Sequence, residues 1–163
     1  MKDNMKVVLV DADESFRMML RQMIEAAGDF EVAGSVGNGA EAWRIIAREC
    51  PQLVVMDVIL PELDGFGLLD RLASMAARPR AILVSAFCQG QMVKRAMKQG
   101  AEAFIPKPCE MEELLGQMRR AAQRAEEENA RDAALERLVT PVIHEVGMPA
   151  TSRGINMSAR PSS

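Results

Sequence analysis

Five short apolar runs recur along the chain, and the segments between them have helical spacing. The runs cover residues 5–10, 30–34, 52–57, 80–85 and 101–106. Three of them are continuously apolar, which is typical of strands that are buried on both faces of a parallel sheet. Between the runs, apolar residues recur every three or four positions, as in Phe16, Met19, Leu20 and Met23. This alternation predicts an α/β fold with a doubly wound, five-stranded parallel sheet.

The last part of the chain has a different pattern. Residues 119–139 are charged and rich in alanine, and they predict a solvated helical linker that extends the fifth helix. Thr140 before Pro141 predicts a separate short helix that ends at Gly147. Beyond about residue 150 the apolar periodicity is lost, so we expect a disordered tail. The predicted organisation is a folded domain over 1–122, a linker over 123–139 and a C-terminal segment over 140–163.

Composition narrows the class of protein. Of the 163 residues, 48% are hydrophobic and 26% are charged, as in ordinary globular proteins. The net charge of −3 argues against nucleic acid as the main partner. No apolar run approaches the roughly 20 residues that span a bilayer, and the N-terminus lacks the pattern of a signal peptide. We therefore expect a cytoplasmic protein with no membrane partner, whose three cysteines are reduced thiols.

Polar residues follow four of the predicted strands. Asp11 and Asp13 come after the first strand, Asp57 ends the third, Ser85 ends the fourth and Lys107 follows the fifth. Ligands of doubly wound sheets bind outside the carboxyl ends of the strands, so we expect these side chains to meet. Clustered carboxylates need a cation or a shared proton, and a small site with oxygen ligands suits Mg²⁺ with a phosphate. Asp57 has the chemistry of a nucleophile toward phosphorus, and the ammonium of Lys107 suits a phosphoryl oxygen.

The residues at the strand ends match a known family. The stretches VVLVDADES, VVMDVILPELDG, AILVSAF and AFIPKP resemble the receiver domain of two-component response regulators, the CheY-like superfamily, over about residues 5–120. The resemblance implies a flavodoxin-like receiver fold. It also implies that Asp57 accepts a phosphoryl group from a histidine kinase or a phosphotransferase. Ser85 would be the switch hydroxyl, and Lys107 would contact the phosphoryl group.

The same resemblance implies a metal site and a switch residue. Asp11, Asp57 and the backbone carbonyl of Ile59 would bind Mg²⁺ or another divalent cation such as Ca²⁺. Phe104 stands at the aromatic switch position of the family, although a plain core residue would look the same in the sequence.

One position sets this chain apart from related proteins. Ala12 stands where the family usually has a second acid after the first strand, so we expect weaker metal binding. Asp13 follows it, and we expect this residue to cap the first helix. We do not expect an enzyme, because an aspartyl-phosphate hydrolase needs a second acid two residues after the nucleophile, where Ile59 stands.

Longer stretches are similar to one subfamily of response regulators. FEVAGSVGNGAEA (30–42) and VTPVIHEVGMPA (139–150) resemble the master regulator of sporulation initiation, a transcription factor. Residues 140–163 would then be a remnant of a truncated DNA-binding effector domain, and we expect no specific DNA binding. The resemblance implies control of sporulation-type transcription, and a homodimer of the phosphorylated form. The alternative is a stand-alone receiver that acts as a protein-interaction module or a phosphate sink.

Overall fold

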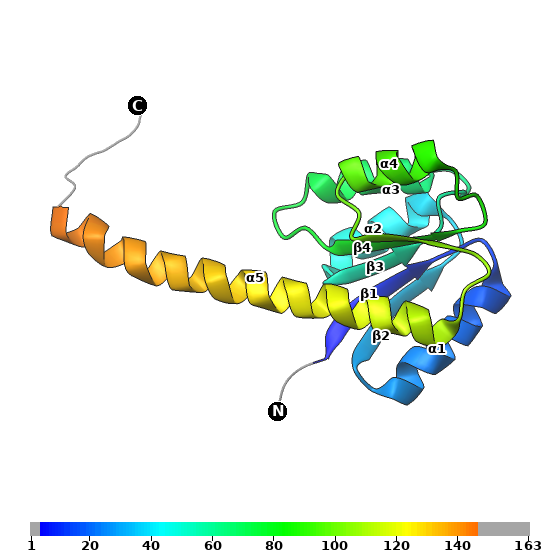
Figure 1. The fold of residues 1–163 in the computed structure, drawn as a ribbon, viewed down its shortest axis with the longest axis horizontal. Coiled ribbons are helices and arrows are strands. Elements are labelled where there is room, and N and C mark those ends of the chain that lie inside the picture. Colours follow the sequence, from blue (N-terminus) through cyan, green and yellow to red (C-terminus); the bar gives the residue numbers. More distant parts are fainter. Residues whose placement is uncertain (1–3, 147–163) are drawn as a thin grey trace. The chain divides into compact units, whose positions relative to one another are not determined.

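A five-stranded parallel sheet with helices on both faces forms the folded part of the protein (Figure 1). The computed structural model describes residues 4–146, with side chains up to residue 138. The elements in chain order are β1 (Met5–Val10), α1 (Glu14–Ala27), β2 (Phe30–Val36), α2 (Gly39–Glu49), β3 (Leu53–Met56), α3 (Gly65–Ala73), β4 (Arg80–Ser85), α4 (Gly90–Lys98), β5 (Ala103–Pro106) and α5 (Met111–Val146). The predicted α/β fold is confirmed.

The order of the strands decides where a ligand can bind. The strands lie in the order β2-β1-β3-β4-β5, and every neighbouring pair is parallel. α1 and the first turns of α5 pack on one face of the sheet, whereas α2, α3 and α4 cover the other (Figure 1). The chain changes its winding direction between β1 and β3. The crevice outside the ends of these two strands is therefore the place where this fold binds ligands.

The outer strands differ from their predicted limits. β2 extends to Val36 instead of residue 34, and β5 begins at Ala103 instead of residue 101. The added residues are Ser35, which carries little apolar surface, and Val36, and both pair with residues of β1. Backbone pairing with the neighbouring strand therefore extends β2 where the side-chain pattern gives no signal.

The last helix is longer than the sequence predicts. α5 runs without a break to Val146, so the predicted start of a new helix at Thr140 is wrong. A proline removes one hydrogen bond from a helix, but flanking residues that favour helix can carry the helix past it. The predicted linker over 123–139 is helical, and every side chain from Glu126 to Leu138 is exposed. The tail expected beyond residue 150 lies outside the described residues.

The chain divides into two units, Met1–Gln123 and Arg124–Ser163. The first unit contains the sheet and both clusters of buried apolar side chains, one on each face. The three cysteines are free. Among the described helices, none is long and apolar enough to cross a membrane.

Candidate functional site

The loop between β1 and α1 places Asp11 at the end of a central strand. Asp11 is 4% exposed, and its backbone N–H donates to the Val36 carbonyl over 3.1 Å. One carboxylate oxygen of Asp11 accepts a hydrogen bond from the Asp13 N–H at 2.9 Å. Asp13 in turn accepts from the Phe16 N–H at 3.3 Å and caps α1. The predicted role of Asp13 as N-cap is confirmed.

Arg17 fixes the same loop from the side of α1. Its guanidinium donates to the backbone carbonyl of Asp11 at 2.5 Å and to the Ser35 hydroxyl at 3.1 Å. The contact joins α1, the end of β1 and the end of β2. Sequence reasoning did not identify this role, although a basic residue beside an apolar helical stripe was a visible signal.

Asp57 lies at the end of the neighbouring central strand. Its backbone N–H donates to the Val10 carbonyl of β1 at 2.9 Å, which fixes the two strand ends against each other. One carboxylate oxygen, Oδ1, accepts from the Ile59 N–H at 3.2 Å. The loop after Asp57 returns at Gly65, whose N–H donates to the Val58 carbonyl over 2.8 Å. The carboxylate is therefore held by a loop that is anchored at both ends.

Lys107 joins the two carboxylates. Its Nζ lies 2.7 Å from Asp11 Oδ2 and 3.2 Å from Asp57 Oδ2. Lys107 directly follows β5, and a cis peptide bond joins it to Pro108. Burial lowers the pKa of Lys107, but the hydrogen bonds and charges of Asp11 and Asp57 outweigh it, so the pKa is raised. Lys107 is therefore an ammonium at neutral pH. The structure thus brings together three of the predicted site residues, Asp11, Asp57 and Lys107.

The other predicted residues lie around this centre. Ser85 is fully buried, its hydroxyl accepts from the Phe87 N–H at 3.2 Å, and its carbonyl accepts from the Lys107 N–H at 2.9 Å. Ile59 is 54% exposed directly after the strand end. Phe104 is half-buried and packs against the apolar cluster on the side of α2, α3 and α4. Ser85 therefore contacts Lys107 through its backbone, whereas Phe104 contacts the apolar cluster beneath α2, α3 and α4.

The donor set fits a hard divalent cation. Two carboxylates and one ammonium leave one net negative charge at the site. The Oδ2 atoms of Asp11 and Asp57 face the ammonium of Lys107, and oxygen ligands from carboxylates and a backbone carbonyl are those that Mg²⁺ and Ca²⁺ prefer. Within the described residues, no group of three His, Cys, Asp or Glu side chains is arranged to hold a metal. A cation would thus rely on Asp11, Asp57, a backbone carbonyl and water.

A shallow groove of about 390 Å³ lies beside the site. The side chains that line it include Asp13, Phe16, Met19, Lys107, Cys109 and Met111. Burial raises the pKa of the Cys109 thiol, and the charge of Glu113 adds to the effect. Cys109 is therefore a thiol, and not a reactive thiolate, at neutral pH.

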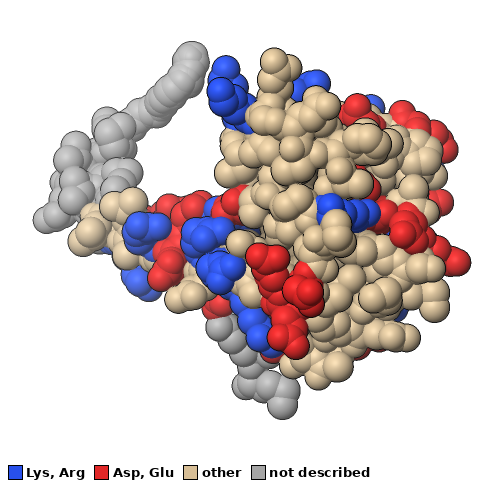
Figure 2. Space-filling view, turned by 45° about the vertical axis from the view of Figure 1, so that its right-hand side comes forward, with Lys and Arg blue, Asp and Glu red and all other residues tan. Residues whose placement is uncertain are grey.

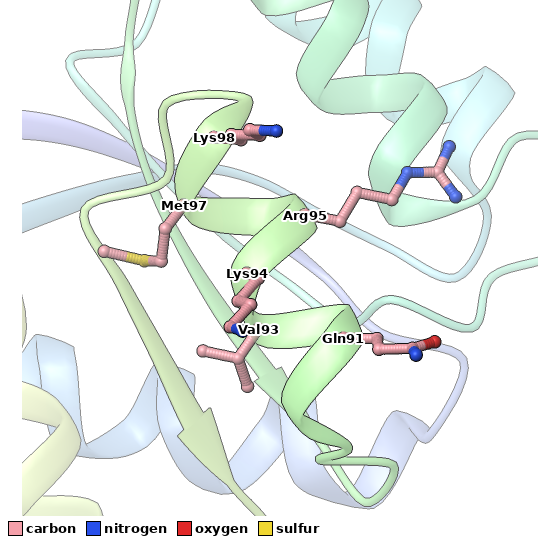
Figure 3. Close-up of a pocket in the computed structure, with 6 residues that line it drawn as sticks. All are labelled: Gln91, Val93, Lys94, Arg95, Met97 and Lys98. Atoms are coloured by element: carbon pink, nitrogen blue, oxygen red, sulfur yellow. The ribbon is translucent and has the colours of Figure 1, made fainter.

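α4 follows the loop after Ser85, and its hydrogen bonds to α3 lie at its C-terminal end. Gln99 donates to the Phe66 carbonyl at 3.0 Å and to Asp70 at 2.6 Å, and Arg95 lies over the Phe66 ring. At the other end, Gln89 makes no side-chain capping hydrogen bond. Figure 3 shows a hollow lined by α4 alone, with Arg95 directed to one side of the helix. The lining residues are Gln91, Val93, Lys94, Arg95, Met97 and Lys98.

Comparison with known proteins decides the family. The family model of the response regulator receiver domain matches residues 7–119. The chain belongs to the response regulator receiver family. This receiver is 36% identical over 110 residues to the chemotaxis protein CheY of Bacillus subtilis, and the match covers 68% of this chain and 91% of CheY. The family that the strand-end motifs predict is thereby confirmed.

Solved structures agree with the receiver fold. The signal receiver domain of the response regulator NarL from Mycobacterium tuberculosis is 25% identical with a TM-score of 0.71, over 75% of this chain and 98% of that domain. A chain of the CheX–CheY complex with BeF₃ and Mg²⁺ from Borrelia burgdorferi is 25% identical with a TM-score of 0.64, over 70% of this receiver and 86% of that chain.

Proposed function

We propose that this receiver accepts a phosphoryl group on Asp57 from a phosphohistidine of a histidine kinase or a phosphotransferase. One observation carries the proposal: the ammonium of Lys107 lies 2.7 Å from Asp11 and 3.2 Å from Asp57, at the ends of the two central strands. A carboxylate beside a fixed positive charge suits attack on a negatively charged phosphoryl group. Membership of the receiver family supports the same chemistry.

In the proposed step, an oxygen of the Asp57 carboxylate attacks phosphorus while the bond from phosphorus to the donor's imidazole nitrogen breaks. The imidazole leaves with that electron pair and takes a proton from solvent. The ammonium of Lys107, next to Asp57 Oδ2, stabilises the charge on the transferring oxygens. When bound by Asp11, Asp57 and the Ile59 carbonyl, Mg²⁺ would supply further positive charge to those oxygens. The Borrelia complex that contains BeF₃ and Mg²⁺ supports this pairing of a metal with a phosphoryl analogue.

The proposed response to phosphorylation begins at Ser85. Phosphorylation replaces the single negative charge of the Asp57 carboxylate by about −1.5 to −2 on the phosphoryl group, and the Ser85 hydroxyl can donate to the new oxygens. If the Ser85 side chain turns toward those oxygens, it would draw the following loop with it, because the Phe87 N–H donates to the same hydroxyl. Phe104, half-buried against the layer that contains α4, would transmit that change to the surface. A shift of such a switch from 1:99 to 99:1 takes about 5.5 kcal/mol of differential stabilisation.

For the output we propose sporulation-type transcription control without specific DNA binding by this receiver itself, and we propose that the phosphorylated form is a homodimer. This part rests on sequence resemblance, in which the stretches at 30–42 and 139–150 take part. The second candidate is an interaction module or phosphate sink. It is favoured by the match that covers 91% of CheY, because a protein of this family can consist of little more than a receiver. Adding the phosphorylated receiver to transcription from a sporulation promoter separates the two: a change in transcript supports the first, and phosphate drain from the donor without such a change supports the second.

Acetyl phosphate with Mg²⁺ tests the site itself. After reaction, mass spectrometry should locate the phosphate on Asp57 of the parent protein and find no modification of Asp57→Asn. Asp64→Asn is the matched control, because Asp64 lies in the same loop, where it caps α3 by accepting from the Gly67 N–H at 2.8 Å. This variant should react like the parent. If Asp57→Asn is modified as readily as the parent, the assignment is wrong.

A further inference from the structure

Phe16 supplies a third contact to the ammonium of Lys107. Nζ of Lys107 lies 4.5 Å from the centroid of the Phe16 ring. The same atom lies 2.7 Å from Asp11 Oδ2 and 3.2 Å from Asp57 Oδ2. The ammonium is therefore surrounded by groups from three elements, namely the end of β1, the end of β3 and the first turns of α1.

The face of an aromatic ring attracts a cation, and the attraction grows when water is excluded. The side chain of Lys107 is only 19% exposed, so little water screens the contact. Phe16 is also fixed, because its N–H donates to Asp13 and its ring packs beside the apolar cluster under α1. A fixed ring at this distance limits the positions that the flexible lysine side chain can occupy.

A role in the core alone does not account for this placement. Phe16 is half-buried and lines the groove beside the site, together with Lys107. A ring that served only to fill the interior would lie further under α1, as Leu20 and Ile24 do. Phe16 instead packs with one part of its surface against the apolar cluster under α1, and its ring also contacts the ammonium of Lys107.

We propose that Phe16 is a positioning residue for phosphoryl transfer, whose ring holds the Lys107 ammonium where the phosphoryl oxygens arrive. The inference rests on the proposed function of Asp57. Without the ring, two carboxylates remain to attract the ammonium, but the cation can move between them and toward solvent. The transition state then loses part of a preorganised positive charge, which slows transfer.

The first readout is spectroscopic and needs no phosphorylation. A ring current shifts the ε-methylene protons of a lysine above the ring upfield in the NMR spectrum. We expect this upfield shift for Lys107 in the parent and in Phe16→Trp, and its loss in Phe16→Leu. Met18→Leu is the control, because Met18 is an exposed residue of the same helix outside the site. It should leave the Lys107 signals unchanged.

The second readout is the rate of Asp57 phosphorylation by acetyl phosphate with Mg²⁺. Phe16→Leu should lower this rate about three- to tenfold, and Phe16→Trp should restore most of it. Incorporation of 4-fluoro- and 3,4,5-trifluorophenylalanine at position 16 keeps the shape of the ring and weakens its negative face. The rate should fall stepwise with fluorine content, so the test stands even if Phe16→Leu fails to fold.

The outcomes separate this inference from the proposed function. Lys107 protons without an upfield shift in the parent, or a rate that is indifferent to fluorine, would overturn the role of Phe16. If the parent is not phosphorylated on Asp57, the proposed function fails and the positioning role falls with it. In that case, an upfield shift of the Lys107 protons would show only that the Phe16 ring and the lysine are in contact.

Discussion

Ala12 stands exposed beside two carboxylates that share one ammonium, and its methyl group offers no ligand to a metal. We expect Ala12→Asp to tighten Mg²⁺ binding by roughly tenfold or more, because the change adds an oxygen ligand and a negative charge at close range. Isothermal titration of both forms measures the difference.

Asp13 provides the control for that experiment. One oxygen of its carboxylate already accepts from the Phe16 N–H, so we do not expect it to bind the metal. Asp13→Asn keeps a capping oxygen and should change Mg²⁺ affinity much less than Ala12→Asp does. If Asp13→Asn weakens binding as strongly as Ala12→Asp strengthens it, Asp13 is a ligand and the vacancy at Ala12 is already filled.

Lys107 makes stability depend on pH at the alkaline end. Burial lowers its pKa, but Asp11 and Asp57 outweigh burial, so the folded protein holds this proton more tightly than the unfolded chain. The stabilisation is fully present below the unfolded pKa of about 10.4 and is lost as pH rises through the higher folded value. Urea denaturation without divalent cations should show this loss. Lys107→Arg keeps its charge to higher pH and should lose less stability over the same range. Equal losses would contradict the assignment.

At the scale of elements, the turn before α3 depends on close backbone approach at Gly65. A Cβ there would lie 2.6 Å from the Asp57 carbonyl oxygen and 2.8 Å from Val58 Cα. Gly65→Ala should therefore destabilise the protein by about 1–3 kcal/mol and displace the loop that carries Asp57. Thermal denaturation and the acetyl phosphate assay measure both effects. Gly90→Ala is the matched control at the start of another helix, where no atom lies within 4 Å of the added Cβ. A Gly65→Ala protein as stable as Gly90→Ala would refute the steric argument.

α5 contains two segments that differ in packing. Leu114, Met118 and Ala121 are buried against the sheet, whereas every side chain from Glu126 to Leu138 is exposed. A solvated helix of this length is marginal in water. In hydrogen–deuterium exchange, amides of 126–138 should therefore exchange faster than those of 114–121 by a factor of roughly 10³ or more. Equal protection of the two segments would mean that another surface covers the exposed one.

At the scale of the whole molecule, the net charge predicts no general affinity for DNA. The net charge is −3, and basic side chains are interspersed with acidic ones on the face shown in Figure 2. Binding to random DNA depends on positive charge that neutralises phosphates. In a gel-shift titration at about 0.15 M salt, we expect no complex with random or operator DNA. A complex that prefers the operator and survives this salt concentration would contradict the expectation.

The sheet could be predicted because burial on both faces leaves a plain signal. β1 and β4 have the predicted limits, since their side chains are almost all buried. At the edge, Ser35 joins β2 through backbone pairing, which side-chain hydrophobicity does not report. The sequence does not predict the continuation of α5 past Thr140, because Thr140 and Pro141 form a local helix-start signal although the flanking residues favour helix.

The site was predictable where it depends on topology. Asp11 and Lys107 are 96 positions apart in the sequence, yet the rule that parallel strands end at one edge brings them together. The contacts of Phe16 and Arg17 were not predictable in the same way. Helical spacing indicates which side of α1 packs inward, but it does not say which group of another strand each side chain meets.

The attachment of α4 has a mechanical consequence. The hydrogen bonds that join this helix to α3 lie at Gln99, through Phe66 and Asp70, and Gln89 has no side-chain cap. The rest of the helix is held by the packing of Met92 and Ala96 on the apolar cluster. Apolar packing is less directional than hydrogen bonding, so a pull on the loop after Ser85 would tilt α4 about its hydrogen-bonded end. Its 9 residues give it a length of about 13 Å, so a tilt of about 10° would move the loop end by about 2 Å while Gln99 stays in place. The displacement would be largest next to the loop that follows Ser85, and it would decrease along the helix toward Gln99.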